Sequence, residues 1–185
     1  GIHIFSEKPQ ALTMQVAHRI DDAIRRAGVQ GTVGFRERYR PIFRETRRLL
    51  ADKAIVHARF QSIRRLPEPG WRELERWGGP GVGVGVHAVD CVRFITAQDV
   101  VHAQAFFCLR PAYSIPVSQS FHYTLANGAT MTMTFVMVTD TAPRGEPWFT
   151  VFYEGGYLAI YGYDHIEVNG ETVYQAEAFD PWLEQ

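Results

Sequence analysis

The sequence predicts a protein of the α/β (α+β) class, with a large, mostly antiparallel open sheet and flanking helices, preceded by one strand–helix–strand unit. Three observations support this prediction. A β-prone segment, an amphipathic segment and a second β-prone segment follow one another at the start of the chain. Residues 130–137 alternate with a period of two, which is typical of a strand with one buried face. Two Asn-Gly pairs separate β-prone runs in the second half, as hairpin turns do.

The first part of the chain has the pattern of a βαβ unit. Residues 2–5 and 32–35 are short and β-prone, and we expect them to form buried parallel strands. Between them, apolar residues recur at helical spacing over 14–27, with Thr13 as a suitable N-cap and Gly28 where a C-cap glycine belongs. Because both faces of a parallel strand pair need cover, one such unit is not a stable domain. The chain is therefore expected to begin in the middle of a larger one.

The pattern changes after this unit. A helix is expected near 41–51, a strand over 54–63 and a second helix over 86–96. From residue 99 onward most of the chain is expected to be strand. The alternation of residues 130–137 assigns Met131, Met133, Phe135 and Met137 to one face of a strand, and Thr130, Thr132, Thr134 and Val136 to the other. We predict type I′ hairpin turns at Asn127-Gly128 and Asn169-Gly170, which makes this part an antiparallel meander.

Composition excludes several classes of protein. The 185 residues are 46% apolar and 21% charged, which rules out disordered and fibrous chains. No segment approaches the roughly 20 apolar residues of a membrane span, and no signal peptide opens the sequence, so we expect a cytoplasmic protein without a membrane partner. Cys91 and Cys108 have neither CxxC nor zinc-ligand spacing, and we interpret them as reduced core residues.

Basic residues gather in the first part of the chain. Residues 1–76 hold 16 Lys and Arg against 9 Asp and Glu, whereas residues 77–185 hold 3 against 11. The run "RERYRPIFRETRR" suggests nucleic acid, but the arginines at 44, 47 and 48 fall on the polar side of a helix whose other side is apolar. That apolar side consists of Ile42, Phe43, Leu49 and Leu50. We therefore expect no nucleic-acid partner.

A glycine-rich stretch, "GGPGVGVGVHAVD" at residues 78–90, raises the question of a phosphate site. Its spacing matches neither the dinucleotide fingerprint G-x-G-x-x-G nor a P-loop, so we reject that interpretation. The stretch leads instead into a helix whose first turns place His87 and Asp90 on a shared face. A helix N-terminus lowers the pKa of a histidine and leaves it available as an acid or base. A capping arrangement is the simpler alternative.

Lys8 is the second candidate for chemistry. It is one of only two lysines and stands in Glu7-Lys8-Pro9, at the carboxyl end of an expected parallel strand, where α/β folds place ligands. Proline restricts the residue before it to extended geometry, which holds the lysine in one direction. A solvated loop lysine is the alternative. A metal site is not expected, because the other histidines are scattered singly without ligand spacing: His3, His18, His57, His102, His122 and His165.

Four segments occur in the order and roughly the spacing of a known family: "GIHIFSEKPQALT", "AGVQGTVGFRERYRPIFRETRRLL", "GWRELERWGGPGVGVGVHAVDCVRFI" and "NGATMTMTF". In combination they resemble the Gfo/Idh/MocA oxidoreductases, the family of glucose–fructose oxidoreductase and inositol dehydrogenase. The resemblance covers most of the chain. It implies a Rossmann domain that binds NAD or NADP, followed by an α/β domain whose open sheet often forms the oligomer interface. It also implies two parts here: residues 1–35, the last strand–helix–strand of a truncated dinucleotide-binding domain, and residues 36–185, a C-terminal substrate-binding and oligomerisation domain.

The resemblance also implies roles for individual residues. Lys8 matches the family's Glu-Lys-Pro lysine, which lies beside the nicotinamide and the substrate, and His87 matches the histidine that acts with it at the substrate hydroxyl. Both are candidate catalytic residues. The candidates for cofactor binding are Glu7, Lys8 and Pro9. The candidates for substrate binding are Arg38, Tyr39, Trp71 and Asp90, with a structural role as the alternative for Asp90.

Two features depart from the family's pattern. Dehydrogenases that share the lysine and the histidine usually carry an aspartate four residues before the histidine, where this sequence has Gly83. Either another acid serves, or the lysine or a tyrosine transfers the proton, or the hydride chemistry has been lost. The second departure is that the segment expected to bind most of the NAD or NADP is absent from this chain. We therefore expect the isolated chain to be inactive.

Three functions remain open at this point. The first is the C-terminal domain of an NAD(P)-dependent oxidoreductase that moves a hydride between nicotinamide and a sugar or polyol carbinol. The second is a catalytically degenerate protein of the same fold that senses a sugar or nucleotide. The third is an assembly module that uses the Thr/Val face of residues 130–138 as its contact surface. A homo-oligomer formed through the antiparallel sheet face is expected for the enzyme and for the assembly module.

Overall fold

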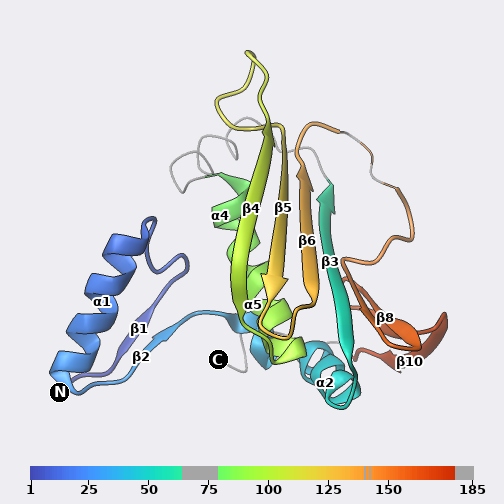
Figure 1. The fold of residues 1–185 in the computed structure, drawn as a ribbon, viewed down its shortest axis with the longest axis horizontal. Helices are drawn as coiled ribbons and strands as arrows, with labels where there is room; N and C mark the ends of the chain where they lie inside the picture. The colour runs from blue at the N-terminus through green and yellow to red at the C-terminus, as the bar shows by residue number, and fades with distance from the viewer. Residues whose placement is uncertain (64–78, 140, 142, 178–185) are drawn as a thin grey trace.

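The computed structural model describes residues 1–63, 79–139, 141 and 143–177, and within these ranges it contains two sheets. One sheet has two strands, and the other has eight in the order β10-β9-β8-β7-β3-β6-β5-β4. Figure 1 shows the small sheet with its helix at one side of the large one. The predicted class, α/β with a large open sheet, is confirmed.

The N-terminal unit consists of β1 (Ile4–Ser6), α1 (Met14–Ala27) and β2 (Gly31–Val33), with the two strands parallel. Helix α1 has the predicted bounds because both of its ends carry local signals. Thr13 Oγ1 accepts a hydrogen bond from the Val16 backbone N–H at 3.3 Å, and Gly28 adopts the left-handed conformation with φ 62°. Both strands are shifted by one or two residues from the predicted ranges.

This unit buries little of its apolar surface within the described part of the chain. Helix α1 contains no buried residue, and Phe5 in β1 is 64% exposed. Other exposed apolar side chains here are Ile2, Ile4, Leu12, Met14 and Val16. The expectation that the unit belongs to a larger dinucleotide-binding domain agrees with this exposure and stays a prediction.

The large sheet is antiparallel apart from one strand pair. Its strands are β3 (Ile55–Ile63), β4 (Val100–Cys108), β5 (Ser118–Leu125), β6 (Thr130–Val136), β7 (Phe149–Tyr153), β8 (Gly156–Tyr161), β9 (His165–Val168) and β10 (Glu171–Gln175). The parallel pair joins β3 to β6, from His57 opposite Thr130 to Ile63 opposite Val136. Strand β3 lies between β6 and β7, so it connects the β4–β6 half to the β7–β10 half.

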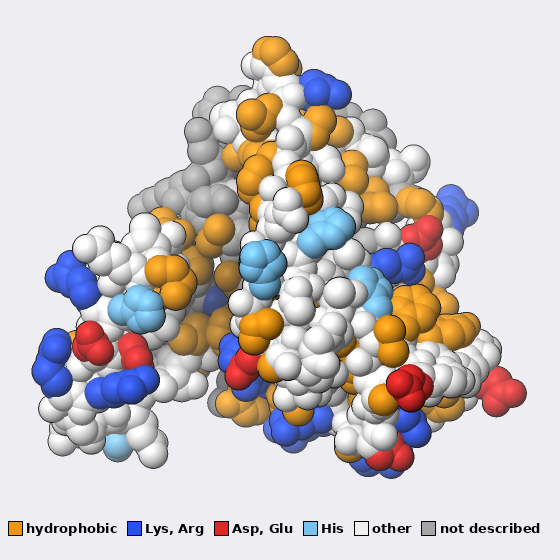
Figure 2. Space-filling model, in the orientation of Figure 1, with side chains coloured by type: hydrophobic (Ala, Val, Ile, Leu, Met, Phe, Trp, Pro, Cys, Tyr) orange, Lys and Arg blue, Asp and Glu red, His pale blue; other side chains and the backbone are white. Residues whose placement is uncertain are grey.

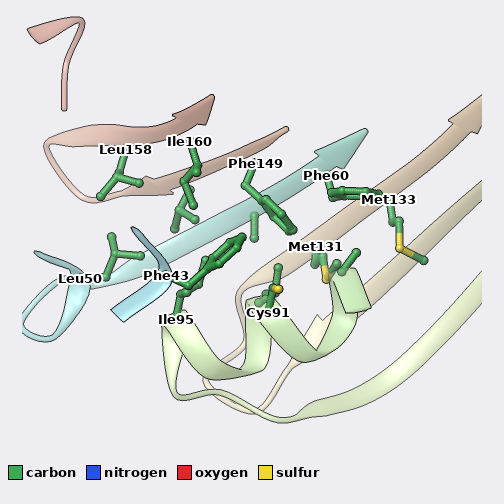
Figure 3. Packing of buried hydrophobic residues seen from close by; sticks show 14 of the residues in the cluster. Phe43, Leu50, Phe60, Cys91, Ile95, Met131, Met133, Phe149, Leu158 and Ile160 are labelled. Atoms are coloured by element: carbon green, nitrogen blue, oxygen red, sulfur yellow. The ribbon is translucent and has the colours of Figure 1, made fainter. Parts of the chain in front are cut away.

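Helices of this part are the 3₁₀ turn η1 (Arg36–Tyr39), α2 (Pro41–Leu50), the short α4 (Pro80–Gly83) and α5 (Gly85–Thr96). Figure 3 shows Phe43 from α2 and Cys91 and Ile95 from α5 packed against sheet residues that include Met131 and Phe149. The ring centroids of Phe43 and Phe149 are 5.8 Å apart in an edge-to-face arrangement. The core of the protein therefore lies between these helices and one face of the large sheet.

The opposite face of the large sheet is open in the described structure. On β6, Met131, Met133 and Phe135 are at most 1% exposed, whereas Thr132 and Thr134 on the other face are half-buried. The predicted alternation is confirmed. Figure 2 shows histidine and apolar side chains on this open face, separated by backbone and by other uncharged side chains.

One of the two predicted turn types is wrong. Asn169 and Gly170 have φ values of 53° and 86°, as a type I′ turn requires. In the other hairpin only Gly128 is left-handed, with φ 84°, and its N–H donates to the Leu125 carbonyl at 2.9 Å. The Asn127 side chain accepts from the Ala129 N–H at 3.0 Å and donates to the Ile55 carbonyl at 3.3 Å. These bonds hold Asn127 out of the left-handed region, and the turn is one residue longer than predicted.

No helix in the described ranges combines the length and the apolar character needed to cross a membrane.

Candidate active site

A pocket of about 500 Å³ opens where the N-terminal unit meets the large sheet. Lys8 lines it from the loop after β1, Glu37 from η1 and His87 from α5. The lining also includes Trp148, just before β7, and Tyr163, in the turn between β8 and β9. Segments that are distant in sequence therefore build one cavity of the size that small-molecule sites have.

Lys8 reaches across from the N-terminal unit to the helices. Its Nζ donates a hydrogen bond to the Gly83 carbonyl at 2.9 Å. Gly83 stands four residues before His87 in the sequence. The side chains of Lys8 and His87 both line the pocket. The structure thus brings together the two residues to which the sequence assigns chemistry. The other two candidates for cofactor binding, Glu7 and Pro9, flank Lys8 and do not line this pocket.

His87 is the third residue of α5 and is half-buried. Its ring meets Phe35 edge-on, with centroids 6.2 Å apart, and its Nδ1 is buried without a hydrogen-bond partner among the described residues. Burial lowers the pKa of His87, the positive charge of Lys8 lowers it further, and the carboxylate of Glu37 opposes both effects. The direction agrees with the prediction, but burial rather than the helix dipole is the main cause. The imidazole is consequently neutral near pH 7 and able to accept a proton.

Removing the charge of Lys8 tests this arrangement. Lys8→Met is expected to raise the pKa of His87, because a nearby positive charge that disfavours the imidazolium is lost. A proton NMR titration of the histidine rings in this chain measures the change. Lys53→Met is the matched control, since Lys53 is the only other lysine and lies beside Tyr153 and Asp52. An unchanged His87 titration in Lys8→Met would contradict the pocket geometry.

Because the pKa of His87 is lowered in the folded chain, the free energy of unfolding is expected to depend on pH. The unfolded chain protonates His87 near the ordinary value of about 6.5, whereas the folded chain does so only at lower pH. The contribution of His87 to folding is therefore complete above that value and is lost as the pH falls from it toward the folded value.

The glycine-rich stretch has a packing role in the structure. It forms α4 and the start of α5, and the Gly81 N–H donates to Gln119 Oε1 at 2.9 Å. A Cβ at Gly81 would lie 2.4 Å from Phe121 Cζ, so only glycine fits this close approach to β5 without displacing that ring. The stretch brings the helix that carries His87 against the sheet.

Two of the candidate substrate-binding residues, Arg38 and Asp90, form an ion pair with each other. Arg38 donates to both carboxylate oxygens of Asp90, with Nε–Oδ2 at 2.8 Å and Nη2–Oδ1 at 2.5 Å, and Asp90 is 3% exposed. Tyr39 is 55% exposed. The structure places all three outside the lining of the pocket. We propose that the Arg38–Asp90 pair holds η1 against α5. Trp71 lies outside the described residues.

The pocket contains groups that sequence analysis did not select. Glu37 is 6% exposed and lies close to two arginines, with Arg40 Nε at 2.8 Å and Arg36 Nε at 3.2 Å. The Tyr163 hydroxyl donates to Glu37 Oε1 at 3.1 Å. A single glutamate between arginines gives no periodic signal, and a tyrosine in a turn gives none either. Burial raises the pKa of Cys91, which also lines the pocket and is inert as a thiol.

Comparison with known proteins identifies the family. The model of the GFO/IDH/MocA C-terminal domain matches residues 43–159, which is more than half of the chain. This chain belongs to the Gfo/Idh/MocA family. The resemblance seen in the sequence is thereby confirmed.

Two curated relatives are oxidoreductases. The uncharacterized oxidoreductase YrbE of Bacillus subtilis is 27% identical over 173 residues, which cover 91% of this chain and 46% of that protein. The D-glucoside 3-dehydrogenase of Escherichia coli is 29% identical over 119 residues, which cover 57% of this chain and 33% of that protein. The chain therefore spans less than half the length of these Gfo/Idh/MocA relatives.

Solved structures agree on the fold. The WlbA dehydrogenase of Chromobacterium violaceum, solved in complex with NADH and UDP-GlcNAcA, has a TM-score of 0.75 and 18% identity. The match covers 95% of this chain and 54% of that one.

Within the described ranges, no group of three or more His, Cys, Asp or Glu side chains is arranged to hold a metal ion.

Proposed function

We propose that this chain is the C-terminal, substrate-binding part of an NAD(P)-dependent oxidoreductase that transfers a hydride between nicotinamide and a carbinol of a sugar or polyol. The observation that carries the proposal is the pocket shared by Lys8 and His87, together with the hydrogen bond from Lys8 to Gly83. Membership of an oxidoreductase family and a D-glucoside dehydrogenase among the relatives support the substrate class.

The described residues fit one side of a nicotinamide and little else of the cofactor. Lys8 follows the carboxyl end of the parallel strand β1, where α/β folds receive ligands, and it faces the pocket. The loop from Glu7 to Thr13 contains no glycine, so it lacks the close backbone approach that a pyrophosphate needs. Segments outside this chain would bind most of the cofactor, and the 185 residues alone would be inactive. When bound, the nicotinamide supplies the hydride chemistry.

The side chains of the pocket would bind the substrate and move its proton. Lys8 Nζ keeps two further N–H donors beside the one that Gly83 accepts, so it can hold the reacting hydroxyl. The neutral imidazole of His87 can take the hydroxyl proton as the alcohol becomes a carbonyl and return it in the reverse reaction. We propose that Lys8 orients the hydroxyl and that Lys8 or His87 transfers its proton.

Activity of a longer protein tests this function directly. The chain is joined to the N-terminal segments that its relatives possess and is mixed with NAD⁺ or NADP⁺ and methyl β-D-glucopyranoside or myo-inositol. We expect one pairing to give reduced nicotinamide, followed by its absorbance. The 185-residue chain should give none and should not bind NADH at micromolar concentration in a fluorescence titration. Tight NADH binding by this chain, or no turnover of any pairing by the longer protein, would contradict the proposal.

A sensor of sugars or nucleotides is the second candidate. It is favoured by Gly83, where the sequence lacks the expected aspartate, and by the buried Nδ1 of His87, which has no partner among the described residues to orient the ring. A sensor would bind a sugar in the same pocket without turnover.

We also propose a homo-oligomer formed through the open face of the large sheet. Among the described residues, no helix covers this face, which carries small polar side chains such as Thr132 and Thr134 that suit burial against a second flat sheet. The same surface would serve in an enzyme or in an assembly module.

A further inference from the structure

Four side chains at the pocket form a packed cluster, which we call the Tyr163 cluster: Glu37, Trp148 and Tyr163, which line the pocket, and Arg40, which does not. The Arg40 guanidinium lies 3.8 Å from the Tyr163 ring centroid, and Trp148 meets that ring edge-on at 5.0 Å. The Tyr163 hydroxyl donates to Glu37 Oε1 at 3.1 Å. Arg40 is 8% exposed and Glu37 is 6% exposed, so two buried charged side chains contact the Tyr163 phenol.

The direction of the hydrogen bond to Glu37 limits what Tyr163 can offer a ligand. A phenol has one proton, and here that proton points at a carboxylate, which only accepts. Burial raises the pKa of Tyr163 to about 12, and the charge of Glu37 contributes, so the phenol keeps its proton at neutral pH. Tyr163 is 38% exposed and lines the pocket. A ligand that reaches its oxygen would therefore meet lone pairs and no donor.

We propose that Tyr163 binds a ring hydroxyl of the substrate as a hydrogen-bond acceptor, and that Glu37 is a positioning residue that sets this direction. The inference rests on the proposed function and adds a specificity rule to it. The sugar must present a donor at the position that meets Tyr163, so a hydroxyl is accepted while a deoxy, fluoro or keto group is not. The half-exposed ring of Trp148 beside Tyr163 provides an apolar surface for the adjoining face of the sugar ring.

A series of modified sugars tests the rule on the wild-type chain. Methyl β-D-glucopyranoside and its 2-, 3-, 4- and 6-deoxy and deoxyfluoro forms are titrated into the labelled chain, and Kd is taken from NMR shifts of pocket residues. At one ring position the deoxy form should bind about 3- to 10-fold more weakly than the parent, the value of one net hydrogen bond. The fluoro form at that position should be equally weak, because fluorine accepts but does not donate. A fluoro form that restores parent affinity would overturn the inference.

Two variants assign the effect to the Tyr163 cluster. In Tyr163→Phe the parent and that deoxy form should bind with equal Kd. The matched control is Tyr161→Phe, which removes the same kind of bond, from Tyr161 to Glu167 at 3.0 Å, outside the pocket. In Glu37→Ala the freed phenol proton should let the fluoro form bind more tightly than the deoxy form, which a purely structural role of Glu37 would not produce.

The outcomes separate this inference from the proposed function. If the parent glucoside binds in the pocket but Tyr163→Phe keeps the full discrimination, the inference alone is overturned. If the parent glucoside shifts no pocket residue, the sugar substrate of the proposed function fails and the inference fails with it. The sugar series on the wild-type chain decides the donor rule even where a variant does not fold.

Discussion

Lys8→Met, made in the longer protein that carries the cofactor-binding segments, is expected to lower kcat/KM for the sugar by about 10²- to 10⁴-fold. Methionine keeps much of the length of the side chain and removes the ammonium that lies in the pocket with His87. The hydroxyl then loses both a donor that orients it and a charge that favours release of its proton. Steady-state rates of nicotinamide reduction measure the loss.

The chain offers a matched control for this variant. Lys53→Met removes the only other lysine, whose Nζ lies 3.3 Å from an Asp52 oxygen and which does not line the pocket, and should leave kcat/KM unchanged. A Lys8→Met protein that keeps its turnover within about 2-fold would remove Lys8 from the mechanism. If the wild type binds sugar without turnover and Lys8→Met keeps that binding, the sensor is the better account.

Thr132→Arg is expected to weaken self-association by at least about 100-fold, because it puts an unpaired charge into the centre of the proposed interface. Thr132 stands opposite Arg59 on β3, so the new guanidinium also meets a like charge. Sedimentation of wild type and variant over a range of concentrations gives the two dissociation constants.

The control for this variant is a threonine in the other sheet. Thr32 is exposed on β2, and Thr32→Arg should sediment as the wild type does. A wild-type chain that remains monomeric at tens of micromolar, or a Thr132→Arg chain that associates normally, would rule out the open face as the contact surface.

Local signals explain which elements were predictable from the sequence. Helix α1 has its N-cap at Thr13 and its left-handed C-cap at Gly28, and both signals lie directly beside the segment that they delimit. The period of two in β6 likewise reports burial directly. The parallel pairing of β3 with β6 has no such signal, since it joins residues about 70 positions apart. The turn at Asn127 was mispredicted because a contact with the Ile55 carbonyl, also distant in sequence, decides its conformation.

The residues of the candidate site likewise fall into those that the sequence indicated and those that only the structure revealed. The family resemblance selected Lys8 and His87, and the structure brings both into one pocket. It also selected Arg38 and Asp90, but no single-sequence pattern shows that these two pair across 52 positions and lie outside the pocket lining. Glu37 and Tyr163 meet across 126 positions, and neither belongs to a periodic or spaced motif. The proximity of these two side chains was therefore visible only in three dimensions.

The most direct test of the account is a structure of the longer protein with NADH and methyl β-D-glucopyranoside bound. The account predicts that Lys8 Nζ and a ring nitrogen of His87 lie within about 2.6–3.2 Å of the sugar hydroxyl nearest the nicotinamide. A nicotinamide or a reacting hydroxyl located away from the pocket shared by these two side chains would contradict it.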